Sequence, residues 1–162
     1  MRNEAVIVTI QNRTRHKQRG FSLVEVLIAL VIMSVGMLGI AGLYVQSMQA
    51  GRTSMLRHHA VTLAGDVADR IRANPRAGIA YQGAGLNGGC VSGVISCDEV
   101  AMAGHDILLW KQQATATLPD GDVEIVFDDS GTPPTYAINV SWSEPGATTP
   151  PAYAITIPVI PN

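Results

Sequence analysis

The chain has 162 residues, of which 47% are hydrophobic and only 15% are charged, so it holds one modest domain, with or without an anchor. The first twenty residues carry five Lys or Arg and one Glu, a net charge of +4, whereas the rest carry six Lys or Arg and twelve Asp or Glu, a net charge of −6. This asymmetry indicates a targeting segment, and the acidic remainder excludes the clustered positive charge that nucleic-acid binding needs.

An apolar run follows the basic segment, from Phe21 to about Val45, and residues 26–51 contain no charged side chain. This length is close to the ~20 residues that cross a bilayer core. The apolar region of a cleaved signal peptide is shorter, about 7–15 residues. Ile40-Ala41-Gly42 nevertheless resembles a signal-peptidase site, so a cleaved signal and a plain signal anchor both stay open. Either one leaves the N-terminus in the cytoplasm and exports the remainder.

Glu25 stands inside the apolar run. An ionised carboxylate deep in a membrane costs on the order of a few kcal/mol, and such acids usually have a partner. Neither a signal peptide nor a simple anchor needs this residue. The alternative is that Glu25 lies near the headgroups and reaches water.

The residues around this acid resemble the prepilin cleavage and methylation motif of the type IV pilin family. Gly20, Phe21, Ser22, Leu23 and Glu25 match every defined position of that motif, behind a basic leader and ahead of a long apolar helix. The resemblance implies that a prepilin peptidase cuts between Gly20 and Phe21, that Phe21 is N-methylated, and that the helix stays with the mature protein. It also implies that Glu25 pairs with the Phe21 amine of a neighbouring subunit and sets the register of assembly.

Small residues recur every third position within the apolar run, at Gly36, Gly39 and Gly42. Such spacing allows membrane helices to approach closely, although glycine is also common in membrane spans generally. Major pilins usually have a proline midway along this helix and this chain has none, so the glycines are the expected site of any bend.

The helix is expected to continue past the membrane to Ala73. Asp66 with Arg70 and Asp69 with Arg72 have helical spacing, and Asn74-Pro75 is a stop signal. The apolar positions follow an i, i+3, i+4 pattern that predicts one buried stripe: Ala60, Leu63, Ala64, Val67, Ala68 and Ile71.

The remaining sequence predicts a small sheet. Residues 77–104 are rich in glycine and are expected to form a loop with room for one short strand, and residues 106–116 favour a short helix over a strand. Three β-rich runs bounded by turn residues follow, at residues 123–127, 136–142 and 153–159. We therefore expect an α+β fold in which a long N-terminal helix, transmembrane in its first half and amphipathic in its second, packs on an antiparallel sheet.

Looser landmarks resemble the PilV-type minor pilins, also called type IV pilus modification proteins. They are residues 63–75, Trp110, residues 118–121 and residues 140–142, in the order of that group. The resemblance implies a low-abundance subunit that initiates or modifies a type IV pilus and so supports twitching motility. The alternative is an I-type minor pseudopilin of type II secretion, which shares the helix and a similar head.

The predicted organisation has three parts: a leader over residues 1–20, a transmembrane and polymerisation helix over residues 21–51, and an extracytoplasmic head over residues 52–162. In an exported head, Cys90 and Cys97 favour a disulfide, and no nearby CxxC or histidine supports the alternative of a metal site.

No motif predicts an enzyme. His58 and His59 are adjacent and lack the i, i+4 spacing of a metal pair, and His105-Asp106 has no third partner for a catalytic triad. We expect no cofactor, no metal, no small-molecule substrate and no nucleic-acid partner. The resemblance implies as partners the prepilin peptidase and methyltransferase, other minor and major pilins, and inner-membrane lipid. It places the protein first in the inner membrane, with the head in the periplasm, and then in the pilus at the cell surface.

Overall fold

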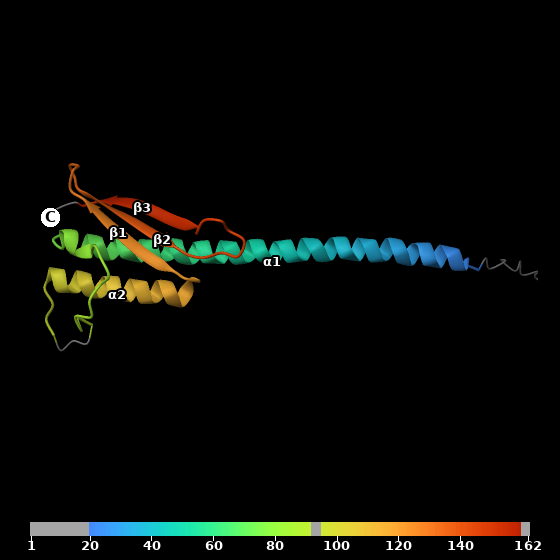
Figure 1. The fold of residues 1–162 in the computed structure, drawn as a ribbon, viewed down its shortest axis with the longest axis horizontal. Helices are drawn as coiled ribbons and strands as arrows, with labels where there is room; N and C mark the ends of the chain where they lie inside the picture. Colours follow the sequence, from blue (N-terminus) through green and yellow to red (C-terminus); the bar gives the residue numbers. More distant parts are fainter. Residues whose placement is uncertain (1–19, 92–94, 160–162) are drawn as a thin grey trace, which may run out of the picture. The chain divides into compact units, whose positions relative to one another are not determined.

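The computed structural model describes residues 20–91 and 95–159, so the predicted leader lies outside the described residues except for Gly20. The first element is the helix α1 (Leu23–Ala73), which agrees with the predicted helix to within two residues. The chain divides into two compact units, residues 1–45 and residues 46–162. The described part of the first unit holds the apolar stretch of α1, and the second unit is the head (Figure 1).

The head contains the rest of α1, a short 3-10 helix η1 (Gly78–Tyr81), the helix α2 (Glu99–Thr117) and one sheet. The strands are β1 (Asp122–Asp128), β2 (Thr135–Ser141) and β3 (Ala152–Pro158), each within one residue of a predicted run. They lie in the order β1-β2-β3, and both neighbouring pairs are antiparallel. The α+β fold expected from the sequence is therefore confirmed.

The register of the strands places one row of apolar side chains across the sheet, buried in β1 and β2 and partly buried in β3. Ile125 of β1 pairs with Ile138 of β2, which in turn pairs with Ile155 of β3. Alternate residues of a strand point to opposite faces, so the buried side chains of β2 (Tyr136, Ile138 and Val140) share one face. This face is the one that covers the hydrophobic core.

One hydrophobic core joins the sheet to both helices. In Figure 1 the strands and α2 flank the green half of α1, whose buried side chains include the whole stripe predicted from the sequence, with Leu56 added. Trp110 of α2 and Trp142, just after β2, are the largest buried side chains, each 1% exposed. Alanines at Ala60, Ala64 and Ala68 leave room beside α1 for these bulky residues, since core packing is close to crystalline density.

The start of α2 corrects the prediction of a loop over residues 77–104. The helix begins at Glu99, and the described part of the predicted loop contains η1 in place of a strand. The Oδ1 atom of Asp98 accepts a hydrogen bond of 2.7 Å from the backbone amide of Ala101, which is the contact of a helix N-cap. The density of glycine up to Gly104 hid this start, because glycine weakens helix propensity without preventing a capped helix.

A polar network crosses the interface between α1 and α2. Trp110 Nε1 donates to Asp66 Oδ2 at 3.0 Å, and Arg70 forms ion pairs with both Asp66 at 3.3 Å and Asp106 at 3.1 Å. Asp106 is only 5% exposed, so this guanidinium offsets a carboxylate that would be costly to bury alone. The pair between Asp69 and Arg72 predicted from the sequence is present at 2.9 Å.

Tyr81, the last residue of η1, also joins this network. Its ring is fully buried, stacks on Trp110 with ring centroids 5.8 Å apart, and meets Tyr136 edge-on. Its hydroxyl donates to Asp106 Oδ2 at 3.5 Å and accepts a bond of 3.2 Å from Asn74 Nδ2. Burial raises the pKa of Tyr81 from 10.0 to about 12, because the phenolate would lose its hydration.

Tyr81 makes the head sensitive to alkali. Between pH 10 and 12 the unfolded chain loses the phenolic proton while the folded chain keeps it, so the free energy of unfolding falls as the pH rises through this range. In the Tyr81→Phe variant we expect a shallower fall, and a loss of about 1 kcal/mol at neutral pH from the missing hydrogen bonds. Denaturant unfolding of the full chain in detergent, at a series of pH values, measures both effects.

The matched control is Tyr153→Phe, at a partly exposed tyrosine of β3. This variant is expected to keep the alkaline slope of the wild type. An unchanged slope in Tyr81→Phe would contradict the assignment of the effect to Tyr81.

Candidate functional site

The beginning of α1 is built on the carbonyl of Ser22. The backbone amides of Glu25 and Val26 donate to this oxygen at 3.1 and 3.2 Å, which starts the helix immediately after Phe21. Gly20 and Phe21 therefore precede the helix as exposed, non-helical backbone, and Phe21 is 83% exposed. The peptide bond between them is accessible in the described chain.

Glu25 lies in the first turn of α1. The unpaired amides at a helix N-terminus carry partial positive charge, so this position favours a carboxylate. Phe21 and Glu25 line one shallow groove together with Val26, Ala29, Leu30 and Met33. The structure thus brings the two predicted assembly residues, Phe21 and Glu25, to the same side of the helix start, surrounded by apolar side chains.

The apolar stretch of α1 is exposed on all sides. Every residue from 20 to 55 is exposed, including large side chains such as Leu38, which is 74% exposed. An 18-residue window has a mean hydropathy of 2.6 and none of it is buried, so among the described residues α1 is the one helix long and apolar enough to cross a membrane. A surface of this kind needs a lipid or protein environment, because exposing so large an apolar area to water is unfavourable.

The three glycines of this stretch have open space beside them in the part of the chain that the structure describes. A Cβ atom added at Gly36, Gly39 or Gly42 would meet nothing within 4 Å. These glycines therefore leave α1 open to close approach by another helix.

The two cysteines form a disulfide in the head. Cys90 and Cys97 are joined with their Cα atoms 5.7 Å apart. The preceding loop is held on α2, because Leu86 donates to the carbonyl of Gly104 at 2.8 Å. Gly85 has a positive φ of 80°, and a Cβ atom there would lie 2.5 Å from the backbone nitrogen of Leu108, so only glycine fits this close approach.

The residues considered for catalysis or metal binding do not come together in one site in the described chain. His58 and His59 are exposed on α1, and Asp106 is held by Arg70 and Tyr81 as part of the core network. His105 is 6% exposed, and neither of its ring nitrogens has a hydrogen-bond partner in the described chain. No group of three or more His, Cys, Asp or Glu residues suited to a metal ion occurs over residues 20–91 and 95–159.

One polar contact of the head could not be predicted from any pattern in the sequence. Glu144, in the turn after β2, accepts a hydrogen bond of 2.9 Å from Trp142 Nε1 and one of 3.4 Å from Thr53 Oγ1. Thr53 and Glu144 are 91 positions apart. A glutamate within a predicted turn gives no indication of such a partner.

Two sequence-family profiles match the chain. Residues 15–41 match the prokaryotic N-terminal methylation motif, and residues 42–108 match the family described as type IV pilin Tt1218. The first match covers the exposed start of α1 with Gly20, Phe21 and Glu25, and the second covers the rest of α1 and the disulfide loop. Neither a curated protein nor a solved structure matches the chain.

The disulfide is expected to stabilise the head. Changing both Cys90 and Cys97 to serine removes a short closed loop, which the chain-entropy estimate values at about 2.5 kcal/mol. Denaturant unfolding of the full chain in detergent measures the free energy of unfolding. This free energy should fall when the wild type is reduced, and it should be equally low in the serine variant without reductant. The serine variant itself should not respond to reductant. Equal stability of reduced and oxidised wild type would contradict the prediction.

Proposed function

This chain is a type IV pilin-like protein, and we propose that it is a minor pilin that initiates or modifies the assembly of a type IV pilus. The observation that carries the proposal is the N-terminal methylation motif placed at the start of a helix whose residues 26–51 are exposed and uncharged. A pilin family points to a structural protein, so the proposed action is non-covalent polymerisation with other pilins.

The first step of the proposed pathway is processing. The basic residues of the leader keep the N-terminus in the cytoplasm, and α1 anchors the chain with the head in the periplasm. A prepilin peptidase cuts between Gly20 and Phe21 and the Phe21 amine is then methylated. Two features support this step: the matched motif and the exposed, non-helical backbone at these two residues. An oxidising periplasm also suits the Cys90–Cys97 disulfide.

The second step is transfer of the helix from lipid to a bundle of pilin helices. Lipid tails are as apolar as the side chains of α1, so burial of apolar surface drives this transfer only weakly. Close packing and polar pairs between helices therefore have to make the bundle more favourable than lipid. Gly36, Gly39 and Gly42, which have open space around them, are suited to close helix contacts.

Glu25 supplies the polar pair in this scheme. The charged Phe21 amine and the Glu25 carboxylate are each costly in an apolar environment, and they offset one another when two subunits meet in the correct stagger. A wrong stagger leaves both charges unpaired, so the pair selects one register. The shared groove of Phe21 and Glu25 in the described chain supports this role.

Two features favour a minor pilin over the other members of the family. The apolar stretch of α1 contains no proline, whereas the corresponding helix of major pilins usually has one, and the landmarks at Trp110 and residues 140–142 resemble the PilV-type group. The match to a family described as a type IV pilin favours the pilus over a secretion pseudopilus.

Mass spectrometry of the mature N-terminus tests the function. We expect a peptide that begins at N-methylated Phe21 in the membrane fraction, and the same peptide at low abundance in sheared pili. A start near Gly42 would return the chain to the class of cleaved secretory proteins. A correctly processed chain that is absent from pili but required for protein export would instead support the secretion pseudopilus.

Glu25→Ala tests the assembly residue. We expect normal cleavage after Gly20 but at least about a tenfold loss of the subunit from sheared pili, because an unpaired charge in an apolar site costs more than 1.4 kcal/mol. Quantitative immunoblotting of membrane and pilus fractions measures the loss.

Two further variants separate charge from shape. Glu25→Gln keeps the size of the side chain and should fail like alanine, whereas Glu25→Asp should retain partial incorporation. Normal incorporation of Glu25→Gln would show that the carboxylate charge has no role in assembly.

A further inference from the structure

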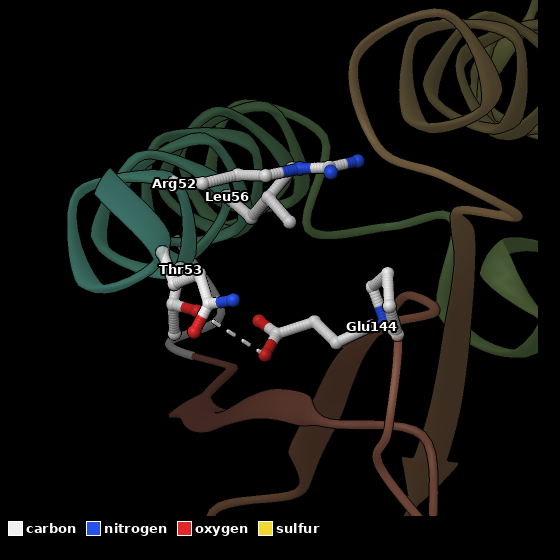
Figure 2. Close-up of a pocket in the computed structure, with 6 residues that line it drawn as sticks. Arg52, Thr53, Leu56 and Glu144 are labelled. Atoms are coloured by element: carbon white, nitrogen blue, oxygen red, sulfur yellow. Dashed lines mark hydrogen bonds between the residues drawn. The ribbon is translucent and has the colours of Figure 1, made fainter. Parts of the chain in front are cut away.

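A polar pocket lies between α1 and the turn that follows β2. Gln49, Arg52, Thr53 and Leu56 of α1 form one side, and Glu144 and Pro145 form the other (Figure 2). Leu56 is 9% exposed and gives the pocket an apolar base. The other five lining residues are exposed or partly exposed, so the pocket is open on the outside of the head.

The two charged residues of this pocket stand on opposite sides. Figure 2 shows the Glu144 carboxylate directed at Thr53 and the Arg52 guanidinium extended above Leu56. Hydrogen bonds from Trp142 Nε1 at 2.9 Å and Thr53 Oγ1 at 3.4 Å fix the position of the carboxylate. Neither Arg52 nor Glu144 forms an ion pair with any residue that the structure describes. The pocket therefore offers one fixed negative and one free positive charge, which suits a zwitterion.

The position of the pocket along the chain limits what can reach it. Gln49 follows Val45, where the apolar run ends, by four positions, and Arg52 follows it by seven. Even a fully extended chain spans no more than about 14 Å over four residues and about 25 Å over seven, at ~3.5 Å each. The headgroup region beside the hydrocarbon core is about 5–7 Å deep. In a membrane-inserted chain the α1 side of the pocket thus begins within about 14 Å of the hydrocarbon boundary, and Arg52 is within about 25 Å of it.

The local charge favours a lipid that carries a phosphate. From Val26 to Gly65 the chain has no Asp or Glu, so Arg52 and Arg57 give this part of α1 a positive charge. A guanidinium binds phosphate oxygens through two parallel hydrogen bonds, and a carboxylate accepts hydrogen bonds from a primary ammonium.

We propose that this pocket binds the phosphoethanolamine headgroup of a membrane phospholipid, with its phosphate on Arg52 and its ammonium on Glu144. The ethylene group between them lies over Leu56, and the acyl chains stay in the bilayer. A choline headgroup has no N–H donor for Glu144, and a glycerol headgroup has no cation. The site goes beyond the proposed function in assembly: it holds the head at a defined depth on the membrane before the helix is extracted.

Native mass spectrometry of the full mature chain, released from nanodiscs, tests the site. The nanodiscs contain phosphatidylcholine with an equal amount of either phosphatidylethanolamine or phosphatidylglycerol, and insertion itself is verified by co-purification. For the wild type we expect retained phosphatidylethanolamine to exceed phosphatidylcholine by about two- to fivefold, the factor that one exposed charge pair supplies. Phosphatidylglycerol should be retained no better than phosphatidylcholine.

Three variants assign the selectivity to the two charges. Glu144→Gln keeps one oxygen that accepts from Trp142 Nε1, and its amide group can donate to Thr53 Oγ1, so the fold is preserved. The preference for phosphatidylethanolamine over phosphatidylcholine should nevertheless disappear. Arg52→Gln should lower the retention of every phospholipid. Arg57→Gln removes an exposed positive charge outside the pocket and is the matched control. This variant should keep the wild-type preference for phosphatidylethanolamine over phosphatidylcholine.

Three results would overturn the proposal. Equal retention of the three lipids by the wild type would exclude a headgroup site of this chemistry. A preference for phosphatidylglycerol that Arg52→Gln and Arg57→Gln reduce equally would show general attraction between a basic surface and anionic lipid. An unchanged preference in Glu144→Gln would exclude the carboxylate as the ammonium partner.

Discussion

The head depends on the burial of one stripe of small and branched residues along α1. Ala60, Ala64 and Ala68 keep the helix surface low enough for the rings of Trp110 and Tyr81 to lie in the same core, while Leu63, Val67 and Ile71 supply apolar area. Full burial of a large aliphatic side chain contributes about 1.5–3 kcal/mol, so this stripe outweighs any single polar contact of the head. The sheet and α2 both depend on it, because the apolar face of a sheet or a helix has to be buried against another element.

Three carboxylates in this protein show three ways to stabilise a charge outside bulk water. Asp106 is buried and has Arg70 and Tyr81 as partners within the chain. Glu144 is partly exposed, and two hydrogen bonds hold it while one side of the carboxylate faces a pocket. Glu25 lies in an exposed apolar stretch, and its shallow groove with Phe21 has apolar neighbours. Asp106 has its partners within the fold. We infer that Glu144 has its partner in a lipid headgroup and Glu25 in a neighbouring subunit.

The same contrast separates the two halves of α1. Residues that face the core of the head are small or branched at helical spacing, whereas residues 26–45 carry no charge, are apolar on nearly every side and remain exposed. A helix that is apolar on every side is stable only inside lipid or protein. In the proposed function α1 passes from lipid to a bundle of pilin helices, while the disulfide and the polar network stabilise the head within the chain.

The sequence by itself determined the elements with a local signal. The apolar run, the stripe of α1 and the three strands follow from periodicity, and the end of α1 follows from Asn74-Pro75, since these patterns depend on neighbours within a few residues. The motif from Gly20 to Glu25 is equally local. The start of α2 also has a local signal, the cap formed by Asp98, but the glycine-rich composition masked it. Tertiary structure decided the pairs Trp110–Asp66, Arg70–Asp106 and Thr53–Glu144. Partners 36 to 91 positions apart leave no pattern along the chain, because the fold alone brings them within hydrogen-bonding distance.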